Sequence, residues 1–566
     1  MTVSSAGSST SNTSQSSTGS ITTTGTNTQS TIDWDALIQA AVDAKLVPAK
    51  AISGQITANQ AKIAAYQKLQ SDLSKLASDL TALSSSVINP FATNVFAARS
   101  ATIGATGNIN PSAALSMTLG NGAATGDHTL TIGQMATAQK VAGATQSSQS
   151  SALGLSGTFS IGLSGGSSAS VTINSGMTLQ QVADAINAQT STTNVQASIV
   201  QLSGGSFELV LSGTQDAADI SYSSTSGDDI FNKLGVTDSS GAFSNVLQSA
   251  QAAEFTLDGI TLTRNTNDIS DVLSGVTFDL LQPTPSGTTL NISIGADTDQ
   301  IATAVQTFVT DYNAFRDDVI AQQATNPDGT AAASAVLFGD GTMRDIMTRV
   351  QQVLGTSVGG LSMSDLGLSF NDQNNELELN ATTLSSILST NLSGVAKLLS
   401  AQTTTSSDQL TVANTGTSPE SFTLDLTVDS SGNLTGASVG ADNSLFTVSG
   451  NSIIGKSGTI YAGMAFIYSG TTSQSITVTS TSGLATQIAQ IAKDASSSTT
   501  GSLQNLINNL QAQDLTMQQK VNDIDSAAAT FQTRLKAQYA KYQAAIQAAN
   551  TTLNALSALL NAKSNN

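Results

Sequence analysis

Residues 502–560, SLQNLINNLQAQDLTMQQKVNDIDSAAATFQTRLKAQYAKYQAAIQAANTTLNALSALL, decide the fold of this chain. Apolar residues recur there at alternating steps of three and four: Leu503, Ile507, Leu510, Met517, Val521, Ile524, Ala528, Phe531, Leu535, Tyr542, Ile546, Ala549, Leu553, Leu556 and Leu560. Because this spacing averages about 3.5 residues, the stripe stays on one side of a helix only if the helix wraps around a partner. The pattern predicts one long coiled-coil helix, in which Asp514 and Gln538 are polar interruptions.

A second stretch near the N-terminus follows almost the same rhythm. Its apolar residues are Ile52, Ile56, Ile63, Tyr66, Leu69, Leu73, Leu76, Leu80, Leu83 and Val87. We expect this helix to pair with the C-terminal helix, which would bring the two ends of the chain together. Pro48 is expected to separate it from a short amphipathic segment, and Asn89-Pro90 to end it, because proline disfavours helix in the residue before it.

The composition excludes several classes of function. The 566 residues carry a net charge of -19, which opposes binding to nucleic acid or to anionic lipid. The chain has no cysteine, and its single histidine, His128, cannot build a histidine-rich metal site. No run of about 18 apolar residues is present. The N-terminus lacks the pattern of a secretory signal. We predict no nucleic-acid partner, no membrane insertion, no cofactor and no metal.

Between the two terminal helices, the spacing of apolar residues alternates between a period of two residues, typical of strands, and a period of 3.6 residues, typical of helices. Runs of period two predict strands at 91–149, 150–249, 250–296 and 401–482. Thr178 is expected to cap a helix inside the second of these regions. Residues 297–400 return to the helical period. The predicted helices carry Ile301, Val305, Phe308, Tyr312, Phe315 and Val319, then Met343 to Leu354, then Leu384 to Leu399.

These patterns predict an α+β multidomain fold, with long terminal coiled-coil helices and a helical bundle that carries inserted β-rich head domains. The predicted segments are a disordered Ser/Thr-rich leader at 1–31, an N-terminal leg at 32–50, the first coiled-coil strand at 51–90, a head domain at 91–149 and 250–296, a second head domain inserted at 150–249, a bundle segment at 297–400, an extra β-rich insert at 401–482, the C-terminal coiled-coil strand at 483–540 and a C-terminal leg at 541–566.

No pattern in the sequence indicates an enzyme. There is no phosphate-binding loop with a lysine, no nucleophile elbow and no cluster of metal ligands. The acidic pairs Asp228-Asp229 and Asp317-Asp318 are interpreted as loop and helix-surface charge. Residues 371–375 are rich in Asp and Asn but lack the spacing of a calcium loop, which favours a hairpin turn. We predict no catalytic residue.

Several local motifs, taken in order, resemble the flagellar filament cap family, also called flagellar hook-associated protein 2. They are Ile32-Asp33 with Leu37-Ile38 and Pro48, GDHTLTIGQMATAQKVAG at 126–143, FTLDGITLTRNTNDISDVLSGVTFDL at 255–280, FVTDYNAF at 308–315, LFGDGTMRDI at 337–346, LGLSFNDQNNELEL at 366–379 and GLATQI at 483–488. The insert at 401–482 lies outside the usual pattern of that family. The last motif is expected to lead directly into the C-terminal helix.

The resemblance implies a structural cap at the distal end of the bacterial flagellar filament. Such a cap is a homo-oligomeric ring that promotes folding and insertion of exported flagellin and prevents its loss. The partners it implies are flagellin, the hook-filament junction protein and an export chaperone at the C-terminus. It implies an extracellular position at the flagellum tip, after export through the flagellar type III apparatus. The alternatives are another flagellar axial protein, either flagellin or a hook-filament junction protein, and a coiled-coil surface adhesin.

The two leg segments are the candidate assembly interface. From Tyr542 to Leu560 an apolar stripe continues and no charge appears before Lys563. An isolated helix gains little from such a stripe but still loses backbone entropy, so both ends are expected to become ordered only against neighbouring subunits. The predicted interface residues are Trp34, Leu37, Ile38, Tyr542, Ile546, Leu553, Leu556 and Leu560.

Overall fold

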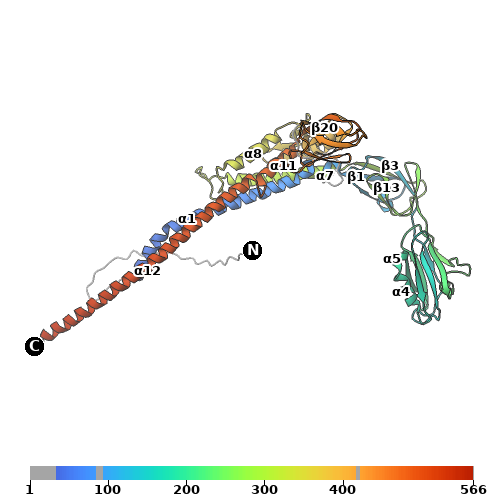
Figure 1. The fold of residues 1–566 in the computed structure, drawn as a ribbon, viewed down its shortest axis with the longest axis horizontal. Helices are drawn as coiled ribbons and strands as arrows, with labels where there is room; N and C mark the ends of the chain where they lie inside the picture. The colour runs from blue at the N-terminus through green and yellow to red at the C-terminus, as the bar shows by residue number, and fades with distance from the viewer. Residues whose placement is uncertain (1–32, 85–93, 416–420, 565–566) are drawn as a thin grey trace. The chain divides into compact units, whose positions relative to one another are not determined.

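A computed structural model describes residues 33–84, 94–415 and 421–564. The chain forms two compact units, one from residues 1–63 with 508–566 and the other from residues 64–507. Two long helices contribute to both units, α1 (Trp34–Asp79) and α12 (Ser502–Ser564) (Figure 1). The predicted leader at 1–31 and the predicted end of the first helix at Asn89-Pro90 lie outside the described residues.

In the first unit, α1 and α12 form an antiparallel coiled coil. One cluster buries Ile38, Val42 and Ala528, with Leu46, Phe531, Leu535 and Tyr539 packed against it. A second cluster buries Ala49, Ile56 and Val521, with Ile52, Met517 and Ile524 around it. Later residues of α1 therefore meet earlier residues of α12. The pairing of the two terminal helices that their spacing predicts is confirmed.

Pro48 does not separate two helical pieces, so that expectation was wrong. It lies inside α1, which runs without a break through the proline. A proline inside a helix removes one backbone hydrogen bond and costs about 3 kcal/mol. The apolar contacts of Val42 and Ala49 with α12, on both sides of Pro48, offset this cost. Packing against a partner helix has overridden a local preference here.

In the second unit, helices from three parts of the chain pack together as predicted. They are the end of α1 with α2 (Thr81–Ser84), then α7 (Thr298–Gln322) and α8 (Gly341–Leu354), then α11 (Leu484–Ser496) with the start of α12. All six residues of the predicted stripe on α7 are buried. Leu69, Leu73, Leu76 and Leu80 are almost completely buried on the α1 side. A short hairpin, β16 (Leu368–Phe370) with β17 (Leu377–Leu379), packs on α7.

Two helices end earlier than the sequence indicates. The run from Leu384 to Leu399 is divided into α9 (Ala381–Thr390) and α10 (Leu392–Leu399), because the side chain of Asn391 accepts a hydrogen bond from the backbone N–H of Gly394. Residues 483–488 begin α11 rather than leading directly into α12. The helix α11 ends at Ser496, and Ser497 Oγ accepts a hydrogen bond from the Thr500 N–H in the connection. Asx and Ser turns of this kind compete with helix.

The first β-rich region contains two antiparallel sheets around one core. Their strand orders are β1-β15-β3-β11-β12 and β13-β14-β2. Leu130, Phe255, Phe278 and Ile292 are among the buried residues. The bounds are β1 (Arg99–Thr106), β2 (Leu115–Leu119), β3 (Gly126–Gln134), β11 (Ala253–Leu257), β12 (Ile260–Arg264), β13 (Asp268–Leu273), β14 (Val276–Leu280) and β15 (Thr289–Ala296).

The second β-rich region also contains two sheets, with strand orders β10-β4-β8-β7 and β6-β5-β9. Thr178 caps α4 (Leu179–Asn187) in a capping box, as predicted. The strand β4 (Lys140–Ala142) belongs to this region, and the chain therefore enters it before residue 149, where the boundary was expected. The other bounds are β5 (Gly157–Leu163), β6 (Ser168–Ile173), β7 (Val195–Gln201), β8 (Phe207–Gly213), β9 (Ile220–Gly227) and β10 (Asn245–Gln248).

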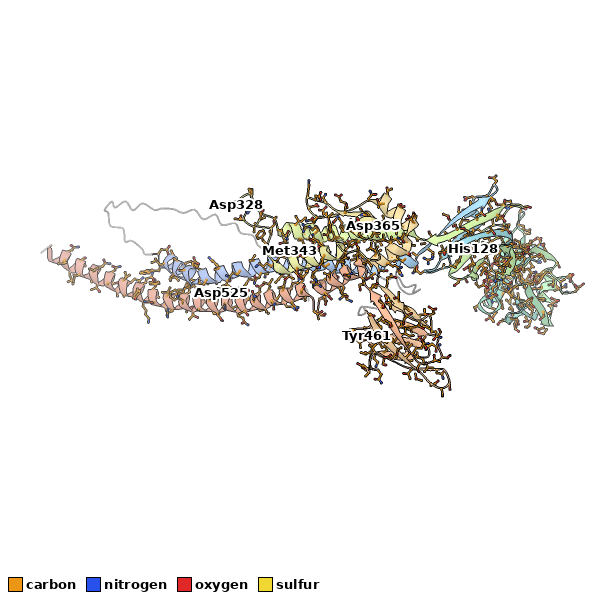
Figure 2. The ribbon with its side chains drawn as sticks, turned by 90° about the horizontal axis from the view of Figure 1, so that it is seen from above. His128, Asp328, Met343, Asp365, Tyr461 and Asp525 are labelled. Atoms are coloured by element: carbon orange, nitrogen blue, oxygen red, sulfur yellow. The ribbon has the colours of Figure 1, made fainter. Side chains whose placement is uncertain are left out.

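The third β-rich region is a pair of four-stranded sheets, β18-β25-β20-β21 and β19-β24-β23-β22. Phe422, Phe446 and Tyr461 form an aromatic cluster in its core (Tyr461 is labelled in Figure 2). The bounds are β18 (Gln402–Thr405), β19 (Leu410–Thr415), β20 (Ser421–Val428), β21 (Leu434–Ser438), β22 (Phe446–Ser449), β23 (Ser452–Gly455), β24 (Met464–Tyr468) and β25 (Gln474–Thr481).

The two ends of each β-rich region lie next to each other, at the point where the region is inserted into the rest of the chain. The Asp297 N–H donates to the Ala98 carbonyl at 3.0 Å, Thr137 and Gln251 exchange two backbone hydrogen bonds, and the Gly483 N–H donates to the Ser400 carbonyl at 3.1 Å. At the last junction only glycine fits, because a Cβ on Gly483 would lie 2.4 Å from the backbone carbon of Leu399. The three regions are therefore nested insertions with paired ends.

Candidate functional site

The predicted interface residues of α1 lie on its first turns, and the structure gives them different roles. Ile38 is buried against α12 in the core of the coiled coil. Trp34 stacks on Tyr539 of α12 with ring centroids 4.8 Å apart. Leu37 is about half exposed and takes no part in these clusters. Of the three residues, only Leu37 has about half of its surface free to contact another molecule.

The predicted interface residues of α12 lie together on one exposed face. Tyr542, Ile546, Leu553, Leu556 and Leu560 follow steps of four, seven, three and four, which keep them on one side of a helix. Their exposed fractions range from 45% to 61%, and Leu559 beside them is 69% exposed. We call these six residues the distal face. No residue between Tyr542 and Lys563 carries a charge.

An apolar face of this size is costly to leave in water. Burying one large apolar side chain contributes about 1.5 to 3 kcal/mol. Contiguous exposed apolar patches of this kind mark protein interaction sites in soluble proteins. The distal face has the chemistry of a surface that binds an apolar groove or a helix of another protein.

An aromatic and cationic cluster next to this face was not predicted from the sequence. Two cations lie near the ring of Phe531: the Lys45 ammonium is 5.6 Å from the ring centroid and the Arg534 guanidinium 5.4 Å. The rings of Tyr539 and Tyr542 lie 6.1 Å apart. Phe531 and Tyr542 belong to the predicted stripe, but Tyr539 does not, because the spacing placed Gln538 at that position. The pairing with Trp34 and Lys45 depends on the antiparallel register, which spacing alone does not give.

The polar interruptions of the stripe find partners. The Asn59 side-chain amide donates to Asp514 Oδ1 at 2.8 Å across the coiled coil. The Gln538 amide donates to the Tyr542 hydroxyl at 2.8 Å on its own helix. A polar pair at a coiled-coil seam specifies register at some cost in stability. Asn59 and Asp514 therefore fix the alignment of α1 on α12.

The other acidic groups considered in the sequence have structural partners. Asp229 Oδ1 accepts hydrogen bonds from the Tyr222 hydroxyl at 2.6 Å and from the Asn232 N–H. Asp318 pairs with Lys68 at 2.6 Å. The turn at 371–375 joins β16 to β17, and the carbonyl of Asn374 accepts a hydrogen bond from Arg316. These contacts explain the acidic residues as ordinary structural groups.

The single histidine lies on β3 (Figure 2). Its Nδ1 is 2.7 Å from Asp258 Oδ2, in the turn between β11 and β12. Hydrogen bonds from His128 and from the Thr129 N–H hold the pKa of Asp258 below its usual range. The pair fastens a hairpin turn to the neighbouring strand. Among the described residues, no helix has the length and apolarity that crossing a membrane requires.

Comparisons with known proteins show which families this chain resembles. Models described as flagellar hook-associated protein 2 C-terminus and N-terminus match residues 250–551 and 30–139, and a flagellin hook IN motif matches residues 158–215. The chain is 29% identical to the A-type flagellar hook-associated protein 2 of Pseudomonas aeruginosa over 264 residues, which are 42% of this chain and 54% of that protein.

Two further proteins are similar. The flagellar hook-associated protein 2 of Escherichia coli K12 is 26% identical over 378 residues, covering 64% of this chain and 76% of that protein. A solved structure titled flagellar cap protein FliD D1-D2-D3 domains, from Escherichia coli, is 25% identical, covers 59% of this chain and 90% of that chain, and has a TM-score of 0.46. The match to the Pseudomonas relative thus spans about half of its length, and the match to the Escherichia coli relative about three quarters.

A helical bundle that carries nested β domains, with paired terminal helices and an exposed apolar face, defines a structural assembly protein. The matched models cover more than half of the chain and include both regions that form the coiled coil. The chain belongs to the flagellar hook-associated protein 2 family.

Proposed function

We propose that this chain caps the distal end of a bacterial flagellar filament as a homo-oligomeric ring, beneath which exported flagellin folds and is added. Membership of the hook-associated protein 2 family supports the cap rather than flagellin, a hook-filament junction protein or a surface adhesin. The family is a structural one, so we propose no catalytic activity. The single structural observation that carries the proposal is the distal face, which is apolar, uncharged and exposed.

The distal face acts as the leg of the cap in this proposal. It binds flagellin at the filament tip or the hook-filament junction protein, and an export chaperone covers it before secretion. Burying six large side chains contributes on the order of 9 to 18 kcal/mol as an upper limit. A helix that also has to become ordered retains only part of that energy. Binding that is strong but reversible suits a cap that must move as each new subunit is added.

The N-terminal half of the interface contributes less in this proposal. Ile38 and Trp34 hold α1 on α12 and so position the base of the leg. Leu37, which is about half exposed, extends the contact surface. The subunit is placed outside the cell at the flagellum tip, and the flagellar type III apparatus exports it.

A deletion and complementation experiment tests this function. Cells without the gene are expected to release flagellin into the medium and to lack long filaments, and the full chain is expected to restore both. A chain truncated after residue 540 should fold but fail to restore filaments. Normal filaments in the deletion strain would refute the cap function, whereas full activity of the truncated chain would refute only the role of the leg.

The domain boundaries remain proposals, and the paired ends of the insert give them a test. Joining Ser400 to Gly483 removes residues 401–482 with little strain, because the two residues already share a backbone hydrogen bond. We expect the shortened chain to keep its helical bundle by hydrogen exchange. We also expect it to assemble filaments, which places the insert outside the cap activity. Loss of protection in α7 and α11 would instead make the insert part of the bundle.

A further inference from the structure

The joint between α1 and α7 carries two copies of one side-chain arrangement. Lys68 Nζ is 2.7 Å from Asp72 Oδ1 on its own helix and 2.6 Å from Asp318 Oδ2 on α7. Lys75 Nζ is 2.7 Å from Asp79 Oδ2 and 2.5 Å from Asp311 Oδ1. The members of the two sets are seven residues apart on both helices. We call them the outer triad (Lys68, Asp72, Asp318) and the inner triad (Lys75, Asp79, Asp311).

Each triad has one cation for two carboxyl groups. The lysines remain more than half exposed, whereas the exposed fractions of the aspartate side chains are lower and range from 4% to 35%. The Asp311 side chain is only 4% exposed. A buried carboxylate without a full set of donors is costly, because water no longer solvates its charge. One ammonium cannot neutralise both carboxylates of a triad.

The inner triad shows which oxygen lacks a donor. Lys75 donates to Asp311 Oδ1, but the buried Oδ2 of the same carboxyl group has no donor in the described part of the chain. Lys75 Nζ lies 2.7 Å from Asp79 Oδ2 and 2.5 Å from Asp311 Oδ1, which brings the two carboxyl groups close together. An oxygen without a donor next to a second carboxyl group is satisfied when one proton lies between the two groups.

The electrostatics of the four carboxyl groups agree with this geometry. Burial, and then the Asp318 carboxyl, raise the pKa of Asp72 to about 6. Burial, and then the Asp79 carboxyl, raise the pKa of Asp311 against the opposing effect of Lys75. Lys75 lowers the pKa of Asp79. Burial acts to raise the pKa of Asp318, but hydrogen bonds to Asp72 and Lys68 outweigh it and lower the pKa. One raised and one lowered pKa in each pair is the behaviour of coupled acids.

The other charged groups near the triads either have partners of their own or are acidic. On α7, Arg316 donates to the Asn374 carbonyl, and Asp317 is exposed. Asp297 and Asp299 line a cavity of about 730 Å³ together with Asp79 and add negative charge there. The nearby phenol of Tyr66 on α1 donates to Asp340 at the start of α8.

The other elements packed on α7 bring little charge. The helices α2 and α9 contain no ionisable side chain, and on β17 Glu378 accepts a hydrogen bond from Asn371. None of these contacts supplies a second cation to the triads.

We propose that each triad holds one proton between its two carboxyl groups beneath the lysine, so that the α1–α7 joint is a pH-responsive clasp. The clasp tightens when the surroundings become mildly acidic and loosens as they become neutral or alkaline. This behaviour is independent of the cap activity, because it concerns the helical bundle and not the distal face.

The sign follows from proton binding. A carboxyl group whose pKa is raised on folding binds its proton more tightly in the folded chain than in the unfolded chain, where the pKa is near 3.8. The stabilisation from Asp72 and Asp311 is therefore complete below about pH 3.8 and is lost as the pH rises through their folded values. The pKa values of Asp79 and Asp318 are lowered on folding, so these two groups act in the opposite sense. Their stabilisation is complete above the unfolded-state pKa of about 3.8 and is lost as the pH falls below it. The two opposing effects place the greatest stability of the joint near pH 3.8, and the contribution of Asp72 falls steadily from there until it is lost above about pH 6.

Hydrogen exchange on the full chain, read by mass spectrometry of fragments, tests the proposal. After correction for the intrinsic exchange rate, protection of α7 is expected to fall by about tenfold or more between pH 5 and pH 7.5, since one unit of pKa shift is a factor of ten. Fragments from β5 in the second β-rich region serve as an internal reference and should show no such change. Equal protection of α7 at both pH values would overturn the proposal.

Two variants give the matched comparison. Asp311→Asn replaces a protonated carboxyl group by an amide that can donate to Asp79 and accept from Lys75, so it should keep at pH 7.5 the protection that the unchanged chain shows at pH 5. Asp317→Asn removes the same charge from an exposed position on α7 and should retain the pH dependence. If Asp311→Asn instead lowers protection at both pH values, Asp311 is an ordinary ionised partner of Lys75 and the proposal fails.

The outer triad provides a second variant in case Asp311→Asn does not fold. Asp72→Asn should reduce the pH dependence of α7 protection and leave the inner triad intact. Infrared spectroscopy adds a direct readout, because a protonated carboxyl group has its own carbonyl band. That band should be present at pH 6 in the unchanged chain and weaker in either variant, and its absence from the unchanged chain would also overturn the proposal.

Discussion

Two parts of α12 have the same heptad pattern and opposite surroundings. From Asp514 to Tyr539, the apolar stripe packs against α1 and includes the buried Val521 and Ala528. From Tyr542 to Leu560, the same kind of stripe is exposed. The difference arises because α1 begins at Trp34, which already lies opposite Tyr539. A stripe therefore predicts that a helix needs a partner, but it does not tell whether the partner is in the same chain.

The largest effect is expected from the exposed part. Leu553, Leu556 and Leu560 changed together to serine should abolish filament growth and release flagellin into the medium, because the leg loses most of its apolar surface. The folded subunit should be unaffected, since these residues are exposed in it. Flagellin in the culture supernatant and helical circular dichroism of the purified chain measure the two effects.

A single exposed leucine in the paired part is the control for this change. Leu515 is 70% exposed but lies outside the distal face. Leu515→Ser should leave filaments normal. Equal loss of filaments in both variants would show that any exposed leucine of α12 matters, and the distinction between the two parts would fail.

The next largest effect is expected where α12 pairs with α1. Ile56→Ala removes a buried side chain between Ala49 and Val521, and such changes cost about 2 to 5 kcal/mol. We expect fast hydrogen exchange in residues 49–60 and in the facing part of α12, with no change in the β-rich regions. Val47→Ala on the same helix is the control, because Val47 is 60% exposed. Unchanged exchange after Ile56→Ala would mean that the pairing contributes little to local stability.

A smaller effect is expected at the polar pair of the seam. Asp514→Ala leaves the Asn59 amide without its partner and should cost about 1 kcal/mol. Replacing both residues by leucine should restore or increase stability but allow other registers. Disulfide crosslinking between cysteines placed at Ile52 and Ile524 measures the register. A single crosslinked product in the double variant would show that the apolar contacts alone fix the alignment.

The smallest effect is expected at the cation above Phe531. Lys45→Gln removes one of the two cations on that ring and should cost about 0.5 to 1 kcal/mol. The change should appear as slightly faster exchange at the N-terminal end of α1. Lys62→Gln, on the same helix and without such a ring contact among the described residues, gives the baseline for losing one positive charge. A larger effect for Lys62→Gln would argue against a role for the ring.

The sequence predicted the elements of the fold well wherever one stripe or one cap decides them. The spacing from Ile301 to Val319 predicted α7, and Thr178 predicted the start of α4. The pairing of the two terminal helices followed from their matching rhythms. In each case a residue and its neighbours in sequence contain the whole signal.

The failures occurred where distant residues decide the outcome. Pro48 should have ended a helix by its own preference, but contacts with α12 carry α1 through it. β4 was assigned to the first β-rich region, although its partner residues in β8 and β10 lie 68 or more positions away in sequence. The candidate interface was predicted as a list of residues. Its division into buried Ile38 and exposed Leu553 depends on where α1 begins relative to α12, which no local pattern contains.

The antiparallel pairing of the two terminal helices also has a consequence for the order in which the chain folds. Asn59 and Asp514 touch although 455 residues separate them in sequence. Closing a loop of that length is slow compared with forming contacts inside one β-rich region. When the chain emerges with its N-terminus first, the contacts of Ile38, Val42 and Ile56 with α12 cannot form until α12 has emerged. We therefore expect the inserted lobes to fold early and the coiled coil to close last.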